Sequence, residues 1–211
     1  GVYSGLAAEW KGTQVAAVAK YNAAPGISVY GGVRAVQNEA EITIPDALIR
    51  GGLAASGDIV GETIAATAPA GTLDYAAETD ADLQFGYVVG AAYEMPEIAL
   101  RVSLTYESGL THDFKTTEEI AAIAPANGEN DMEVEMPQSL ALDFQSGVAA
   151  NTLVFGSIRW SEWSVWEIRP VGYESFTNDR VTGLDNDVFT YRIGVGQRIN
   201  EDISVFGRFT Y

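Results

Sequence analysis

The chain has 211 residues, 47% of them hydrophobic, and a formal net charge of −17 from 29 acidic and 12 basic residues. Nucleic acid is not expected as a partner, because phosphate binding requires a basic face. No stretch approaches the ~20 apolar residues of a helical membrane span, so a helical membrane protein is excluded. Cysteine is absent, which fits an exported protein without disulfides.

Alternating apolar and polar residues predict strands from the N-terminal part onward. The first strand is predicted over residues 13–21, and a tight turn at residues 22–26 contains Pro25-Gly26. The second strand covers residues 27–36, and its pattern can extend to residue 44. A long segment rich in glycine and alanine follows, from about residue 45 to residue 80.

The strongest strand signal lies in residues 82–110. Two runs of strict alternation flank the turn at Met95-Pro96, and each run has one apolar, aromatic face and one polar face of small residues. This length exceeds that of most strands in water-soluble proteins, about 5–6 residues. A strand between lipid and a polar lumen needs this pattern. The apolar faces comprise Leu83, Phe85, Tyr87, Val89, Ala91, Tyr93, Ile98, Leu100, Val102, Leu104 and Tyr106.

The rest of the chain repeats this arrangement. A second long segment is predicted at about 112–133, followed by strands at 136–147 and 153–168 around a short turn. A third long segment covers about 169–186, and the last hairpin consists of strands at 187–199 and 203–211. The chain therefore has about eight strands whose connections alternate between short and long, as in bacterial outer-membrane barrels.

We predict an all-β fold, a transmembrane antiparallel up-and-down β-barrel. A soluble β-sandwich is the alternative, and it would bury the apolar faces under a second sheet. Long structureless loops are uncommon in compact soluble domains, which favours the barrel. No linker divides the chain, so residues 1–211 are expected to be part of one transmembrane domain.

Catalytic residues are not expected, and the protein is predicted not to be an enzyme. The one histidine, His112, is followed by Asp113 and has no second ligand nearby, so it is interpreted as a satisfied surface side chain. No Gly-x-Ser-x-Gly motif or phosphate loop is present. No cofactor or metal site is therefore predicted.

The lumen face carries the more informative residues, because its alternation places half of the chain's basic residues inward. Two interpretations stay open. The arginines either pair with inward acids such as Glu94, Glu107 and Asp143, or they bind the anionic head of an apolar molecule. The inward arginines are Arg34, Arg101, Arg159, Arg192, Arg198 and Arg208.

A ligand site is predicted from six of the inward residues. Arg101, Arg159 and Arg192 would hold a carboxylate, and the rings of Tyr30, Phe155 and Trp163 would line the apolar part. For Trp163, packing inside the lumen is an equal alternative. Trp160 and Trp166 share the outward parity and are interpreted as members of an interfacial aromatic belt.

Two features of the long segments suggest contacts outside the lumen. Their acidic residues are interpreted as a solubilising surface, or as ligands for divalent cations shared with lipopolysaccharide. The apolar residues of segment 45–80 form either a capture surface for a hydrophobic substrate or a short helix that caps the barrel. They are Leu48, Ile49, Leu53, Ile59, Val60, Ile64 and Leu73.

Several segments resemble the FadL/TodX family of outer-membrane transporters for long-chain fatty acids and other hydrophobic compounds. The resemblance covers most of the chain, from about residue 13 to residue 211, and it depends on the order of several weak motifs. The segments are YGGVR at 30–34, LRVSLTYESGLTHDF at 100–114, MPQSLALDF at 136–144, RWSEWSVW at 159–166 and DVFTYRIGVGQRINEDISVFGRFTY at 187–211.

The resemblance implies a 14-stranded barrel, an N-terminal hatch in the lumen, apolar capture by outer loops and lateral release into the membrane. This chain departs from the family pattern because it has no hatch segment and only about eight strands. It is therefore expected to be an internal piece of a longer protein.

The expected function is passive, binding-assisted transport of long-chain fatty acids or other hydrophobic molecules across the bacterial outer membrane. The protein is expected to be a monomer in contact with outer-membrane lipid and lipopolysaccharide. The alternatives are a general diffusion pore or structural barrel, and a soluble β-sandwich that binds ligands.

Overall fold

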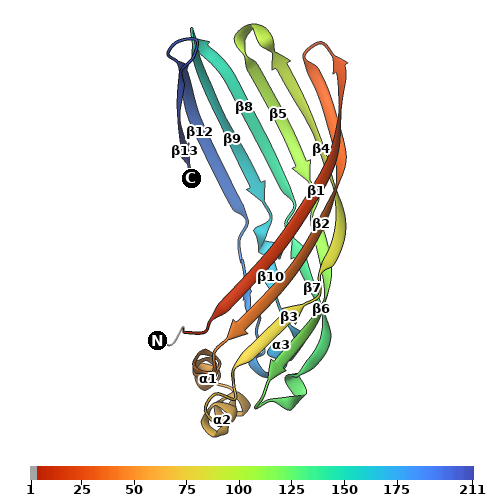
Figure 1. Cartoon of the computed structure of the whole chain (residues 1–211), viewed down its shortest axis with the longest axis vertical. Helices are drawn as coiled ribbons and strands as arrows, with labels where there is room; N and C mark the ends of the chain where they lie inside the picture. The colour runs from red at the N-terminus through yellow and green to blue at the C-terminus, as the bar shows by residue number, and fades with distance from the viewer. Residues whose placement is uncertain (1–3) are drawn as a thin grey trace.

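A computed structural model describes residues 4–211 of the chain (Figure 1). Eight long strand paths cross the molecule, and three of them consist of two consecutive strands. The paths are β1 (Ala7–Ala24), β2 (Ile27–Ile44), β3 with β4 (Tyr75–Thr79, Asp82–Met95), β5 with β6 (Leu100–Glu107, Leu110–Ile120), β7 with β8 (Gly128–Met136, Ser139–Ala149), β9 (Thr152–Ser161), β12 (Val188–Arg198) and β13 (Ser204–Thr210).

The eight paths lie side by side in the order in which they occur in the chain, and every neighbouring pair is antiparallel. Short connections, including the one-turn helix η1 (Pro96–Ile98), join them at one end, which we call the short-turn end. The predicted antiparallel up-and-down arrangement is confirmed. The soluble-sandwich alternative is wrong, because residues 4–211 contain no second sheet that covers the outer face.

The outer face of the sheet is apolar over the half near the short-turn end. On β4 the odd-numbered residues are exposed and apolar, and Phe85 is 71% exposed. The even-numbered residues, such as Gln84 and Glu94, lie on the inner face and are partly covered. Exposure of so much apolar surface to water is unfavourable, so this band is the lipid-facing surface of the sheet.

The sheet continues beyond the lipid band, where its outer face becomes charged. Residues 112–133 were predicted to be a loop, and that prediction is wrong for most of them, because β6 and β7 form a paired hairpin closed by η2 (Ala124–Ala126). The alternation persists there with apolar residues inward and charged residues outward, such as Asp113, Lys115, Glu133 and Glu135.

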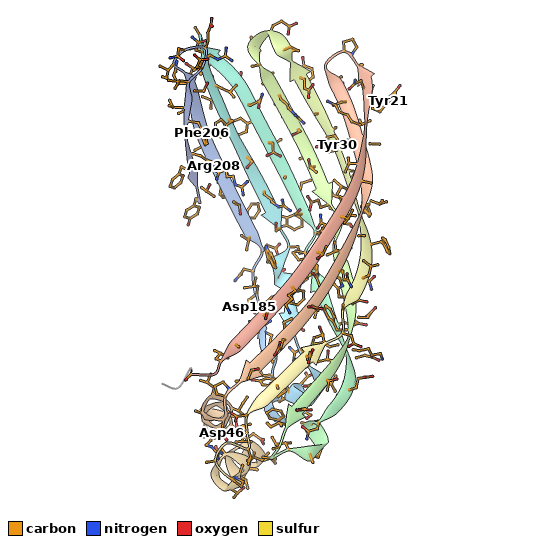
Figure 2. The ribbon with its side chains drawn as sticks, viewed as in Figure 1. Tyr21, Tyr30, Asp46, Asp185, Phe206 and Arg208 are labelled. Carbon is orange, nitrogen blue, oxygen red and sulfur yellow. The ribbon has the colours of Figure 1, made fainter. Side chains whose placement is uncertain are left out.

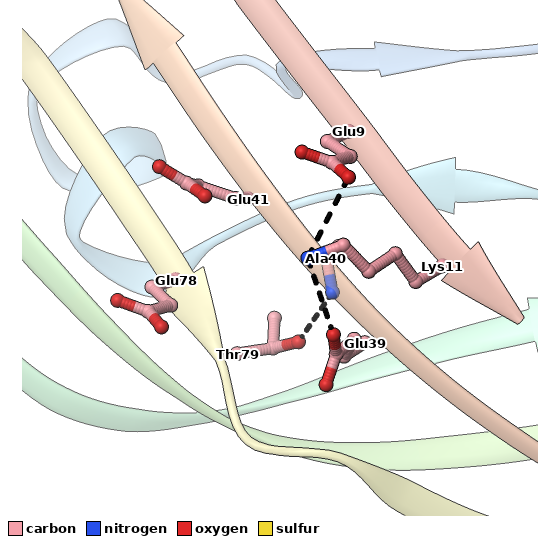
Figure 3. A pocket seen from close by; sticks show the side chains of 7 residues that line it. All are labelled: Glu9, Lys11, Glu39, Ala40, Glu41, Glu78 and Thr79. Atoms are coloured by element: carbon pink, nitrogen blue, oxygen red, sulfur yellow. Dashed lines mark hydrogen bonds and ion pairs between the residues drawn. The ribbon is translucent and has the colours of Figure 1, made fainter.

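The charged outer face also includes β1, β2 and β3. Lys11 lies between Glu9 and Glu39, with N–O distances of 3.5 and 3.4 Å, and Glu41 and Glu78 lie nearby (Figure 3). This part of the wall therefore belongs in water rather than in lipid. Within residues 4–211 no group of three or more acidic or histidine side chains is arranged to hold a metal ion.

A cap of helices and short strands covers the inner face at the end opposite the short turns (Figure 1). Its core contains Phe114 and Val134 from the sheet, Leu53 and Leu73 from segment 45–80, and Ile168. The cap elements are α1 (Asp46–Ala55), α2 (Ile59–Thr67), η3 (Trp163–Val165), β10 (Glu167–Ile168), α3 (Val171–Thr177) and β11 (Thr182–Gly183).

Segment 45–80 divides between the two interpretations made from the sequence. Ile49, Leu53 and Leu73 are buried in the cap core, as the capping interpretation predicts. Ile59 and Val60 of α2 are 78% and 61% exposed, so part of the segment remains an accessible apolar surface. None of the helices in residues 4–211 is long and apolar enough to cross a membrane.

Buried polar groups connect the cap to the sheet. Glu118 of β6 is fully buried and accepts hydrogen bonds from the Tyr75 hydroxyl and from the backbone N–H groups of Gly172 and Tyr173 at 2.7–2.8 Å.

His112 is also fully buried, with its ring nitrogens 2.8 Å from Asp82 and 2.9 Å from Asn38. The surface position predicted for His112 is therefore wrong. His112 is nevertheless a satisfied side chain, as the sequence suggested.

The lipid band predicts different effects for two outward substitutions. Leu104 of β5 faces lipid and Thr117 of β6 faces water. Leu104→Arg should lower the free energy of unfolding by about 2–4 kcal/mol, because an arginine near the bilayer midplane is costly. The matched variant Thr117→Arg should change it by less than about 0.5 kcal/mol. Denaturant unfolding of the full-length protein in lipid bilayers measures both values, and equal values would contradict the assigned band.

A pH effect is predicted in the cap, outside the lipid band. Hydrogen bonds from the Arg50 guanidinium lower the pKa of Asp46, which also accepts the N–H groups of Gly71 and Leu73 at 3.0 Å. A lowered folded-state pKa stabilises the cap above the ordinary carboxyl pKa, and this contribution is lost as the pH falls. The greater hydrogen-exchange protection of the Gly71 and Leu73 amides in wild type than in Asp46→Asn should therefore shrink from about pH 6 to about pH 3. A constant difference would contradict this origin.

Candidate functional site

The register of the sheet arranges inward side chains of the lipid-band region in rows that run across the strands. One row contains Tyr30 and Arg159, joined through Gly90, Thr105 and Ala141. A second row contains Ser103, Asp143, Ser157 and Arg192. A third contains Glu94, Arg101, Gln145, Phe155 and Arg208, with Gly194 before Arg208. Five of the six residues predicted for the ligand site therefore lie on three rows of one face.

The sheet curls so that its two edge strands line the same space, which we call the luminal cavity. The cavity has a volume of about 780 Å³ and is lined by Lys20 from β1 and Arg208 from β13. Figure 2 shows Tyr30 and Arg208 on strands at opposite sides of the sheet. Between them the lining includes Tyr30, Arg101, Phe155 and Arg192, four of the predicted site residues. The volume suits a small organic molecule, for which sites measure roughly 300–1,000 Å³.

Two glycines let the aromatic rings lie against the cavity wall. A Cβ atom at Gly90 would lie 2.3 Å from the Tyr30 ring, and one at Gly194 would lie 2.5 Å from the Phe155 ring. Any larger residue would push these rings toward the cavity centre. The Tyr30 hydroxyl is held by a hydrogen bond with Thr105 Oγ1. The sequence therefore places both rings along the wall and keeps the space open.

Two of the three predicted arginines are paired with acids of the wall. Arg101 Nε lies 3.6 Å from Glu94 Oε1, which also pairs with Lys20 at 3.4 Å. Arg159 Nη2 lies 3.4 Å from Glu107 Oε2 and donates to Ser139 Oγ at 2.8 Å. These contacts form the arginine–carboxylate network that was one of the two interpretations of the sequence.

A second arginine shares the Glu107 carboxylate. Arg34 Nη1 lies 3.8 Å from Glu107 Oε2, and Nη2 donates to the Ser108 carbonyl oxygen. The Arg34 side chain is 9% exposed, whereas that of Arg159 is 45% exposed. Solvent therefore screens the Arg159 pair far more than the Arg34 pair, although the Arg159 distance is shorter.

Arg192 and Arg208 differ from these arginines, because neither forms an ion pair or side-chain hydrogen bond with any residue in 4–211. Arg192 is paired in register with Thr210 and Arg208 with Gly194, so the two are diagonal neighbours on β12 and β13. Diagonal neighbours lie roughly 7–8 Å apart, within reach of long side chains. Asp143 also lines the cavity but is two strands away from Arg192.

Trp163 does not join the other five predicted residues. Strand β9 ends at Ser161, so the predicted strand 153–168 is too long and the parity that placed Trp163 inward does not continue. Trp163 lies in η3 beside Trp166, with ring centroids 6.3 Å apart, and is not part of the cavity lining. Trp166 packs against the cap core near Trp10, so its predicted place in the aromatic belt is wrong. Trp160 does lie on the outer face, as its pairing with Phe189 shows.

Some residues of the cavity were missed by the sequence analysis. Lys20 was not considered because β1 gave only an apolar-face signal, and Arg208 was placed inward but left out of the site. The pairing of each arginine with an acid depends on the register between strands, and the alternation of residues within one strand does not specify that register. The pairing of Arg101 with Glu94 required the register across the β4–β5 turn. The turn was predicted at Met95-Pro96, but the pairs Glu94–Arg101 and Met95–Leu100 enclose residues 96–99, so counting outward from the predicted turn would have paired Glu94 with Glu97 instead.

The chain matches the family model described as "Outer membrane protein transport protein (OMPP1/FadL/TodX)" over residues 1–205. A search of curated protein sequences gave no match.

Solved structures of three proteins share the fold. The toluene transporter TodX of Pseudomonas putida is 13% identical, with a TM-score of 0.65, and the match covers 97% of this chain and 55% of the TodX chain. The toluene transporter TbuX of Ralstonia pickettii is 14% identical, with a TM-score of 0.63, and the match covers 97% of this chain and 56% of TbuX. A FadL homologue of Pseudomonas aeruginosa is 11% identical, with a TM-score of 0.64, and the match covers 92% of this chain and 48% of the homologue. This chain therefore spans about half the length of these proteins.

Burial predicts unequal coupling within the Arg34–Glu107–Arg159 cluster. A double-mutant cycle for Glu107→Gln and Arg34→Ala should give a coupling energy of about 1–3 kcal/mol in unfolding experiments. The cycle for Glu107→Gln and Arg159→Ala should give less than about 1 kcal/mol, because that pair is largely solvated. A larger coupling for Arg159 than for Arg34 would contradict the assignment of Arg34 as the buried partner.

Proposed function

Because the chain belongs to the outer-membrane transport protein family that includes FadL and TodX, we propose that the full-length protein passes hydrophobic molecules with an anionic head through its barrel. The protein resides in the bacterial outer membrane, and this chain forms part of its β-barrel. Residues 1–211 are proposed to belong to one transmembrane domain. The short turns would face the periplasm and the cap would face the outside.

The distribution of charge supports an anionic substrate. The chain has a net charge of −17, yet the inner wall of the lipid-band region carries more bases than acids. The luminal cavity is lined by four bases, Lys20, Arg101, Arg192 and Arg208, and one acid, Asp143. Glu94 pairs with both Lys20 and Arg101, so the bases exceed these two acids by two. This excess raises the local concentration of anions and makes the carboxylate of a fatty acid or aromatic acid more favourable there than a neutral group. A general diffusion pore would not need the apolar rings that accompany the charges.

The observation that carries the proposal is the absence of a partner acid for Arg192 and Arg208 within residues 4–211. We assign these two guanidinium groups to the carboxylate, because arginine binds carboxylates through paired, charge-assisted hydrogen bonds. Arg101 and Arg159 are already paired with wall acids. They would contribute a positive electrostatic potential rather than direct contacts with the carboxylate. Tyr30 and Phe155 would contact the apolar part. Trp163 lies in η3, outside the cavity lining, and is not assigned a contact with the ligand.

The proposed path begins at the outer cap. The exposed Ile59 and Val60 of α2 would make the first contact with an apolar molecule. The cap covers the inner face between α2 and the luminal cavity, so the proposed path requires the cap elements to move. The step is binding and diffusion through such openings, with no covalent chemistry and no cofactor. The protein is proposed to act as a monomer, with outer-membrane lipid and lipopolysaccharide around its wall.

Dodecanoate binding to the full-length protein in detergent tests this assignment. Arg192→Ala and Arg208→Ala should each weaken binding about tenfold or more, the effect of losing a hydrogen bond to a charged group. Arg159→Ala is the matched control on the same inner face, and it should change the affinity by less than about threefold because Glu107 already occupies that guanidinium. Dodecanol, which lacks the carboxylate, should bind equally to all four proteins. No saturable dodecanoate binding by the folded wild type would refute the proposal.

A further inference from the structure

The water-facing part of the wall has an open strand edge at β7. Strand β7 pairs with β6 on one side, and on its other side no strand of residues 4–211 pairs with it. Its next neighbour along the wall would be β9, which pairs with β8, the continuation of β7. That pairing ends at the bond from the Glu162 N–H to the Gln138 carbonyl oxygen. This edge therefore arises inside the wall, away from the two ends of the sheet at β1 and β13.

The register shows which backbone groups lie along this edge. The Asp80 N–H donates to the Lys115 carbonyl oxygen, so the backbone groups of Lys115 point toward β3. The direction alternates along an antiparallel strand, so those of Thr116 point toward β7, where Asn130 is the partner in register. The odd-numbered residues of β7 therefore point their N–H and C=O groups away from β6, and within residues 4–211 these groups have no hydrogen-bond partner. These residues, which we call the β7 edge, are Glu129, Asp131, Glu133 and Glu135.

The strand that carries the edge is held firmly on its other sides. Met132 and Val134 are buried in the cap core, and the even-numbered residues are paired in register with β6. The β7 edge thus presents backbone donors and acceptors in an extended and ordered conformation, which is a template for a further strand. Because β7 is already ordered, addition of a strand would cost little conformational entropy on the side of this protein.

The side chains of the β7 edge select the kind of partner. All four are carboxylates that face water. Lys115 of β6 pairs with Asp131, and the other three form no ion pair within residues 4–211. The same edge of a second copy would place acids against acids, which is unfavourable. A strand with lysine or arginine at every second residue would instead place a base beside each acid.

A cavity of about 290 Å³ lies where the β7 edge meets the end of β9. Its lining includes Glu135, Met136 and Gln138 on one side and Glu162 and Val165 on the other. Two carboxylates and no base line this cavity. The Gln138 amide donates to one oxygen of Glu162 at 2.7 Å and so holds that carboxylate in place. The volume and the charge suit the side chain of one lysine or arginine.

We propose that the β7 edge binds an extended basic segment of another polypeptide by antiparallel strand addition. Lysine or arginine residues at alternate positions bond to the edge backbone groups, and their side chains pair with the four carboxylates. One of these side chains enters the cavity beside Glu135 and Glu162. Antiparallel pairing is the more stable arrangement and continues the pattern of the wall. The site lies outside the lumen, so this inference is independent of the proposed transport function.

Peptide binding to the full-length protein in detergent tests the proposal. The probe is an eight-residue peptide of alternating lysine and threonine, whose lysine N–H groups face β7 in antiparallel addition. Backbone N-methylation of the two central lysines should weaken binding at least about tenfold, because two hydrogen bonds are lost. N-methylation of the two central threonines is the matched control with the same charge, and it should change the affinity by less than about threefold. Equal affinities of the two methylated peptides would overturn strand addition and leave attraction to negative charge alone.

Two charge reversals on the outer face locate the site. Glu133→Lys places a base on the β7 edge and should weaken binding of the lysine–threonine peptide about tenfold or more. Glu78→Lys is the matched control, because Glu78 is an exposed outward acid of β3, away from this edge. It changes the net charge equally and should weaken binding less than about threefold. An equal loss in both variants would contradict the location.

Hydrogen exchange resolved to single amides provides an independent measurement on the full-length protein. In the free protein the amides of the β7 edge should exchange rapidly, whereas those of Asn130 and Met132, paired with β6, should be protected. The lysine–threonine peptide should slow exchange at the edge amides at least about tenfold and leave the other two unchanged. Protection of the edge amides in the free protein would overturn the proposal, because the edge would then already be paired. Exchange that the saturating peptide does not change would overturn it as well.

Discussion

The structure depends on the requirement that each backbone N–H and C=O group in the lipid band be paired within the protein. A sheet meets it when each strand pairs with both neighbours, and the period-two geometry of its strands then separates lipid-facing from inward side chains. Leu104 and Phe85 face outward, whereas Thr105 and Gly86 next to them face inward. The same separation that makes the wall compatible with lipid therefore creates an inner face on which polar and charged groups can be placed.

The charges of the protein are divided by this geometry. Acidic residues dominate the outer wall above the lipid, where water solvates them, and bases dominate the luminal cavity. Among residues 4–211, wall acids pair with Arg101 and Arg159 but not with Arg192 or Arg208. The paired charges are therefore part of the wall structure, and the unpaired ones are those that our proposal assigns to a ligand.

Much of the fold can be predicted from alternation, because lipid imposes a strict apolar pattern on one face. The strands of residues 82–107 and the short turn at Met95-Pro96 are examples. The pattern gives less information where the wall leaves the lipid, so the β6–β7 hairpin was taken for a loop. It also fails at strand ends, which is why Trp163 was assigned to the lumen. The partners of each arginine depend on register, a long-range property that no local pattern specifies.

A crystal structure of the full-length protein with bound dodecanoate tests the central claim most directly. The account predicts a carboxylate within hydrogen-bonding distance of Arg192 and Arg208. The claim would be contradicted if both guanidinium groups were paired with acidic side chains from the rest of the protein. An ordered ligand bound elsewhere, with the luminal cavity free of it, would contradict the claim equally.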